Sequence, residues 1–124
     1  MALDVLIVDD SAAIRKILHR VLVQAEVPLG KVHEASDGNE ALEKLKVEKV
    51  GLILSDINMP NMDGIQMIAA VRKLPANAFI PILMLTTESQ AEKKDAGRKA
   101  GATGWIVKPF NTEQLLSTIQ KLVK

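Results

Sequence analysis

The chain has 124 residues, of which 48% are hydrophobic and 25% charged, so its composition fits one folded domain and excludes a disordered chain. Lysine and arginine total 16 and aspartate and glutamate total 15, so the net charge of +1 gives no chain-wide reason to bind nucleic acid or an anionic membrane. Cysteine is absent, which excludes disulfides, zinc–thiolate sites, iron–sulfur clusters and thiol nucleophiles.

The first half of the chain predicts two strands and two helices in alternation. Leu3–Val8 is apolar on both faces, which is typical of a strand covered on both sides. Apolar residues at helical spacing follow over residues 14–25. Lys31–Ala35 is more polar and predicts an edge strand, and a shorter helical stripe follows at Ala41, Leu42 and Leu45.

The second half predicts three buried strands, at Gly51–Leu54, Ile80–Leu85 and Gly104–Val107. Helical stripes occupy residues 65–74 and 115–123. Residues 88–100 are helical by position but poorly amphipathic, and Gly97 within them costs about 1 kcal/mol of helix propensity relative to Ala. We therefore expect this fourth helix to be the least rigid.

Three helix starts carry capping residues. In each, the first side chain can accept a hydrogen bond from a free backbone N–H, and the side chain three positions later can bond back. The pairs are Asp37 with Glu40, Asp63 with Gln66, and Asn111 with Gln114. The resulting βα order, repeated five times, predicts an α/β fold: a doubly wound, five-stranded parallel sheet with helices on both faces.

Ionisable and hydroxyl side chains follow the strands at their carboxyl ends, where such sheets bind ligands. They are Asp9 and Asp10 after the first strand, Asp56 after the third, Thr86 and Thr87 after the fourth, and Lys108 after the fifth. At ~5 Å and an effective dielectric constant of ~20, each pair of carboxylates repels by roughly 3 kcal/mol, which would raise a pKa. Lys108 compensates one charge, and Mg²⁺, or alternatively Mn²⁺, would compensate the others.

A cluster of carboxylates, a metal ion and a lysine suits phosphoryl transfer, because both cations can bind phosphoryl oxygens. Asp56 is the best candidate nucleophile, since the adjacent pair Asp9 and Asp10 has the pattern of a metal-holding unit. Asp9 and Asp10 could instead cap the next helix with Ser11, but capping needs one acid. The basic residues of that helix, Arg15, Lys16, His19 and Arg20, are interpreted as a solvated face, with a partner contact as the alternative.

Four segments in register, VDDSAAIR, SDINMPNMDGI, LTTES and TGWIVKPF, resemble the receiver domain of bacterial response regulators. The resemblance covers essentially all of residues 1–124, interpreted as a single domain. Since no output domain follows the last predicted helix, the stand-alone, CheY-like chemotaxis type is expected. The resemblance implies the flavodoxin-like strand order 2-1-3-4-5.

The resemblance implies a role for each site residue. Asp56 would be the phosphoacceptor, and Asp10 and Asp56 would bind magnesium directly, with the backbone carbonyl of Asn58 as a third ligand and Asp9 acting through water. Thr86 would be the switch hydroxyl and Lys108 the phosphoryl-binding cation.

Other positions would tune or transmit the switch. Asn58 and Glu88 occupy positions that tune dephosphorylation, and the bond before Pro109 would be cis. Trp105 replaces the usual Tyr or Phe of the aromatic switch, and its larger ring is expected to bury incompletely.

The implied function is a phosphorylation-activated two-component switch, which is not an enzyme with a separate substrate. A histidine kinase would donate the phosphoryl group, and an output protein, with the flagellar motor switch as a candidate, would bind the surface of the fourth helix, fifth strand and fifth helix. We expect a cytoplasmic protein, since no secretory signal or membrane-length apolar run occurs. A monomer is also expected.

Four alternatives stay open. The chain could be the receiver of a longer regulator with a DNA-binding output domain, or an interaction domain that takes no phosphate. A phosphatase of the haloacid dehalogenase type would need a second acid where Asn58 stands. A flavodoxin-like FMN carrier disagrees with the charges of Asp9 and Asp10 and with an aromatic content of 2%.

Overall fold

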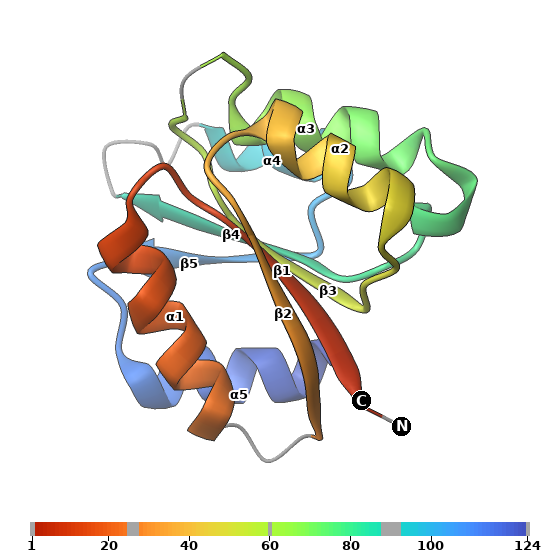
Figure 1. Ribbon diagram of the computed structural model, residues 1–124. Helices are drawn as coiled ribbons and strands as arrows, with labels where there is room; N and C mark the ends of the chain where they lie inside the picture. The colour runs from red at the N-terminus through yellow and green to blue at the C-terminus, as the bar shows by residue number, and fades with distance from the viewer. Residues whose placement is uncertain (1, 25–27, 60, 88–92, 124) are drawn as a thin grey trace.

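The computed structural model describes residues 2–24, 28–59, 61–87 and 93–123 (Figure 1). The strands are β1 (Leu3–Val8), β2 (Leu29–Ala35), β3 (Leu52–Asp56), β4 (Ile82–Thr87) and β5 (Gly104–Lys108). The helices are α1 (Ala12–Gln24), α2 (Gly38–Val47), α3 (Gly64–Arg72), the short 3-10 helix η1 (Pro75–Asn77), α4 (Lys93–Ala100) and α5 (Thr112–Val123). Strands and helices therefore alternate as predicted.

The strands form one 5-stranded sheet in the order β2-β1-β3-β4-β5. All four neighbouring pairs are parallel. Helices α1 and α5 cover one face of this sheet, and α2, α3 and α4 cover the other (Figure 1). The predicted doubly wound fold and strand order are thus confirmed. No helix in the described part of the chain is long and apolar enough to cross a membrane.

Two hydrophobic clusters lie on the two faces of the sheet, because successive strand residues point to opposite faces. Val5 and Ile7 of β1 pack with Leu18 of α1 and Leu115 of α5. Leu6 and Val8, on the opposite face of the same strand, belong to a second cluster, to which α2 and α3 contribute Ala41, Leu45, Met67, Ile68 and Val71. Burial on both faces explains why the segments of β1, β3 and β4 are apolar without alternation. The prediction that Gly104–Val107 is buried in the same way is wrong, because β5 lies at the edge of the sheet and only Ile106 of it is buried.

Two residues of the predicted helical stripes do not lie on the buried face of a helix. Ile17 is 42% exposed, so the buried stripe of α1 is narrower than its sequence indicates. Leu74 lies beyond α3, with φ −82 and ψ 118. The ring of Pro75 disfavours the helical conformation in the residue before it, so α3 ends before Leu74.

Of the three predicted caps, only Asp63 with Gln66 forms a complete capping box. Asp37 accepts from the Glu40 backbone N–H at 2.8 Å, but the Glu40 carboxylate accepts a hydrogen bond from Ser36 Oγ instead of bonding back. Asn111 Oδ1 accepts from the backbone N–H groups of Glu113 and Gln114, at 2.8 and 3.2 Å.

Candidate functional site

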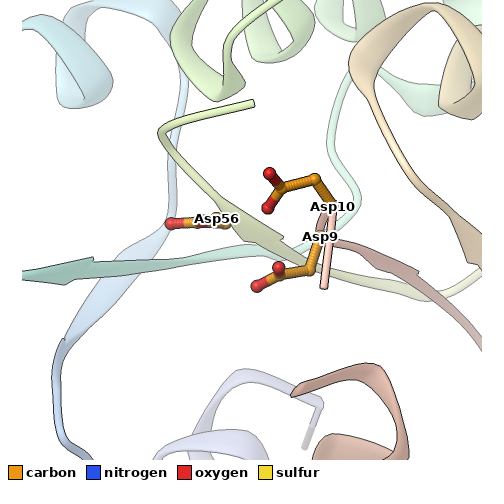
Figure 2. A group of neighbouring side chains, drawn as sticks. All are labelled: Asp9, Asp10 and Asp56. Carbon is orange, nitrogen blue, oxygen red and sulfur yellow. The ribbon is translucent and has the colours of Figure 1, made fainter. Parts of the chain in front are cut away.

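Three carboxylates meet at the carboxyl end of the sheet (Figure 2). Strands β1 and β3 are parallel neighbours, with Val8 opposite Ser55, so the next residues, Asp9 and Asp56, lie side by side. One carboxylate oxygen from each of Asp9, Asp10 and Asp56 lies within 4.8 Å of the other two. The predicted convergence of these acids is confirmed.

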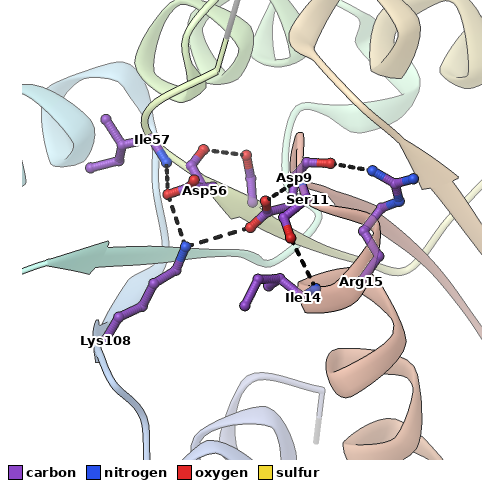
Figure 3. A network of polar contacts seen from close by, with 8 residues as sticks. Asp9, Ser11, Ile14, Arg15, Asp56, Ile57 and Lys108 are labelled. Atoms are coloured by element: carbon purple, nitrogen blue, oxygen red, sulfur yellow. Dashed lines mark hydrogen bonds and ion pairs between the residues drawn. The ribbon is translucent and has the colours of Figure 1, made fainter.

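Lys108 reaches this cluster from the end of β5, on the far side of β4. Its Nζ lies 3.3 Å from Asp56 Oδ1 and 3.5 Å from Asp9 Oδ2 (Figure 3). One ammonium group therefore compensates parts of two carboxylate charges. This is the cation expected at the site from the sequence.

The acids differ in exposure and in hydrogen bonding. Asp9 is 1% exposed and Asp56 is 8% exposed, or 12% for its side chain alone, whereas Asp10 is exposed. The Asp56 Oδ1 atom also accepts from the backbone N–H of Ile57 at 2.8 Å. Asp9 Oδ1 accepts from the backbone N–H of Ser11 at 2.9 Å. The backbone thus orients the two less exposed carboxylates.

Burial raises the pKa of Asp9 above its usual value. The Ser11 N–H and the Lys108 charge oppose that rise, and the negative charge of Asp56 adds to it. The sequence predicted a raised pKa from repulsion between carboxylates, but desolvation is the larger cause. Only the folded chain could show this, because burial depends on what packs around the strand end.

Arg15 belongs to the site rather than to a solvated face. Its Nε donates to Glu34 Oε1 at 2.8 Å, and its Nη1 donates to the backbone carbonyl of Asp9. Arg15 therefore ties α1 and β2 to the backbone of the acidic cluster. Lys16, His19 and Arg20 are exposed, as the sequence predicted.

The hydroxyl group of Thr86 lies in an unusual environment. The residue is 1% exposed, and its Oγ1 has no hydrogen-bond partner among the described residues. Leaving a buried polar group unpaired costs about 1–3 kcal/mol. The hydroxyl is therefore available to a group that binds at the strand ends. The structure describes the backbone of the adjacent Thr87 but not its side chain.

Asn58 is exposed, two residues beyond Asp56, and its Oδ1 accepts from Lys93 Nζ at 3.4 Å. The roles of Asn58 as a backbone metal ligand and in dephosphorylation stay predictions. Glu88 lies outside the described residues. The bond between Lys108 and Pro109 is cis, as expected from the resemblance.

Gly64 is a site residue that sequence reasoning did not single out. A Cβ atom there would collide with the backbone carbonyl of Asp56 and lie 2.8 Å from Met84 Cε. The Gly64 N–H donates to the Ile57 carbonyl at 2.8 Å. Only glycine allows α3 to begin this close to the strand that carries Asp56. Its place directly after the cap Asp63 was the available sequence signal.

The donor set is suited to a hard divalent cation. All three side chains offer carboxylate oxygens, and Mg²⁺ and Mn²⁺ prefer such ligands over nitrogen or sulfur. A dication would also offset the repulsion that Lys108 compensates only in part. The residues present therefore fit the metal that the sequence predicted.

A family model described as "Response regulator receiver domain" matches residues 5–120. The structure of chemotaxis response regulator CheY4 of Vibrio cholerae is 47% identical, covers 98% of this chain and 99% of that chain, and has a TM-score of 0.88. The receiver domain of the sensor histidine kinase PA1611 of Pseudomonas aeruginosa, solved with magnesium in its active-site cleft, shares the fold at 21% identity, with 99% and 98% coverage and a TM-score of 0.86.

A curated relative is the transcriptional regulatory protein SrrA of Staphylococcus aureus, 35% identical over 124 residues. The match covers 100% of this chain and 49% of SrrA. The chain therefore spans about half the length of the curated relatives it matches.

Proposed function

The chain belongs to the response regulator receiver domain family, and from this premise we propose that it is a phosphorylation-activated switch with Asp56 as its phosphoacceptor. The observation that carries the proposal is the contact of 3.3 Å between Lys108 Nζ and Asp56 Oδ1, beside the carboxylates of Asp9 and Asp10. Lys108 therefore supplies a positive charge beside the negative charge that phosphorylation of Asp56 would add.

Both Lys108 and the Ile57 N–H contact Oδ1 of Asp56, so we assign Oδ2 as the nucleophile. This oxygen attacks the phosphorus of a phosphohistidine on a histidine kinase. The new O–P bond forms as the P–N bond breaks, and the imidazole leaves as a neutral ring after taking a proton from solvent. Lys108 then stays beside the acyl phosphate and stabilises its oxygens.

Magnesium would be held by Asp9, Asp10 and Asp56, with the Asn58 carbonyl as a further ligand, and Mn²⁺ would suit the same oxygens. When bound, the metal supplies charge neutralisation at the phosphoryl oxygens. The exposed position of Asp10 gives a cation access from solvent.

The switch would start at Thr86, whose hydroxyl has no partner among the residues that the structure describes and can donate to a phosphoryl oxygen. Thr86 and Trp105 lie on adjacent strands β4 and β5, so a shift of Thr86 changes the packing beside Trp105. The surface of α4, β5 and α5 then differs between the two states, and an output protein that prefers one of them detects the signal.

This function involves no separate substrate, and slow autodephosphorylation, tuned at Asn58 and Glu88, would reset the switch.

The identity of 47% to CheY4 over almost the whole chain favours a chemotaxis role, with the flagellar motor switch as the output partner. We propose a cytoplasmic monomer that does not itself bind nucleic acid. SrrA supports the second candidate, a receiver within a longer transcriptional regulator.

The test is labelling by radioactive acetyl phosphate in millimolar magnesium. The wild-type chain should acquire one acid-stable, base-labile phosphoryl group, and Asp56→Asn should acquire none. Asp63→Asn is the matched control, since Asn is also a good helix cap and the change removes a carboxylate outside the cluster. Labelling of Asp56→Asn at the wild-type rate would move the acceptor to another residue.

Magnesium binding has its own measurement. Millimolar magnesium should raise the melting temperature of the wild-type chain by linkage, and Asp10→Ala should abolish the rise. A rise that persists in Asp10→Ala would place the cation elsewhere.

A further inference from the structure

Helix α4 is attached to the protein without a buried apolar side chain. Its sequence is KKDAGRKA, and Gly97 is its only buried residue. Helices in proteins are stabilised mainly by packing of an apolar face. Ala100, which is partly buried, is the one apolar side chain of α4 that packs against the cluster of Leu6 and Val8, so contacts of other kinds contribute to holding α4 beside the sheet.

Two cations of α4 lie over the ring of Trp105. Lys94 Nζ is 5.4 Å and Arg98 Cζ is 5.3 Å from the ring centroid. The two residues are four apart, so they share one face of the helix. Both distances are within the range of a cation–π interaction. Trp105 is itself half-buried and packs against the cluster that contains Met84.

Trp105 is also close to the proposed switch hydroxyl. Met84 of β4 is opposite Trp105 of β5, and Thr86 is two residues beyond Met84. Since side chains two apart share a face of a strand, Thr86 and Trp105 are on the same face of the sheet as α4. The Trp105 ring, which α4 holds, therefore lies beside Thr86, the residue through which the site would transmit its signal.

We propose that Lys94 and Arg98 are positioning residues that hold the Trp105 ring against α4 and thereby set how readily the switch leaves its resting state. We call this arrangement of Lys94 and Arg98 over the Trp105 ring the clamp. The clamp itself follows from the geometry around Trp105, and its effect on switching rests on the proposed function. Each cation–π contact at an exposed site corresponds to about a two- to fivefold change in an equilibrium constant.

The clamp is tested first in the unphosphorylated protein, because Trp105 is the only tryptophan and tyrosine is absent. Lys94→Ala and Arg98→Ala should each increase quenching of Trp105 emission by acrylamide and shift the emission to longer wavelength. Arg98→Lys keeps a cation and should restore most of the protection. Lys99→Ala, on the same helix but not over the ring, should leave the emission unchanged.

Unchanged quenching in a folded Lys94→Ala/Arg98→Ala double variant would overturn the clamp. Circular dichroism establishes whether that variant folds. If it does not, Lys94→Gln and Arg98→Gln, which preserve the aliphatic stems, provide the same comparison.

The effect on switching is tested by titrating beryllofluoride, a phosphoryl mimic, in the presence of magnesium. Because the clamp favours the resting state, Arg98→Ala should bind the mimic about two- to fivefold more tightly than the wild-type chain. Arg98→Lys and Lys99→Ala should bind it as the wild-type chain does. Equal or weaker binding by a folded Arg98→Ala would overturn the effect on switching.

These results are distinguishable from a failure of the proposed function. If Asp56 is not the acceptor, labelling of Asp56→Asn persists while the quenching experiment is unaffected. If the clamp is absent, labelling still requires Asp56, and only the quenching and binding differences disappear.

Discussion

The ammonium group of Lys108 lies between two carboxylates, 3.3 Å from Asp56 and 3.5 Å from Asp9. Lys108 is the last residue of β5, so its side chain crosses the end of β4 to reach Asp56, which ends β3, and Asp9, which follows β1. A point charge on a flexible stem suits this position, because it can shift toward a phosphoryl group while staying near both acids.

Replacing Lys108 with Met should destabilise the metal-free protein. The change leaves two largely buried carboxylates without their shared cation, and we expect the free energy of unfolding to fall by about 1–3 kcal/mol. Magnesium should recover much of this loss because it compensates the same charges. Urea unfolding with and without magnesium measures both effects. Lys121→Met, an exposed change on α5, is the control, and an equal loss there would remove the electrostatic explanation.

Asp9→Asn should stabilise the metal-free protein at pH 7. Because the folded pKa of Asp9 is raised from 3.8, its favourable contribution is present below that value and is lost as the pH rises through the folded pKa. Asn carries no charge and avoids this loss while keeping an acceptor for the Ser11 N–H. The gain should be clear at pH 7 in EDTA and vanish toward pH 3, and magnesium affinity should fall. A destabilised Asp9→Asn at pH 7 would contradict the direction of the pKa shift.

The cap residue Asp37 predicts the opposite pH dependence. Its pKa is lowered first by the Glu40 N–H and then by the side chain of Asn61. Its contribution is therefore present above 3.8 and is lost as the pH falls through the folded pKa. Asp37→Ala should be less stable than the wild-type chain at pH 7, and the difference should shrink in acid. Asp37→Asn retains the cap without the charge, so a similar pH dependence in that variant would assign the effect to another group.

Two glycines should respond in opposite ways to alanine. A Cβ atom at Gly97 meets nothing within 4 Å, so Gly97→Ala should add about 0.5–1 kcal/mol of stability through helix propensity. Gly64→Ala collides with the backbone of Asp56, and should both lower stability and slow labelling by acetyl phosphate. Thermal melts and labelling rates compare the two. Equal responses would show that the space beside each glycine does not decide the outcome.

Some predictions from the sequence were less accurate, and each for a local reason. The helix through Leu74 ended early because Pro75 constrains the residue before it. Arg15 was assigned to solvent because helical spacing shows which face is polar but not whether a backbone carbonyl lies opposite. Trp105 is half-buried, as its size led us to expect, but the two cations over its ring could not be inferred from spacing.

The sequence alone determined the order of strands and helices, because apolar runs and helical spacing are local properties of the chain. It also placed Asp9, Asp10, Asp56, Thr86 and Lys108 at one edge, because parallel strands have their carboxyl ends on the same side. Tertiary structure alone decided how buried each group is and which partner it meets. The raised pKa of Asp9 and the position of Lys108 between two acids depend on atoms distant in sequence, because those atoms decide desolvation and hydrogen bonding. The same holds for Thr86, whose hydroxyl meets no hydrogen-bond partner within the part of the chain that the structure describes.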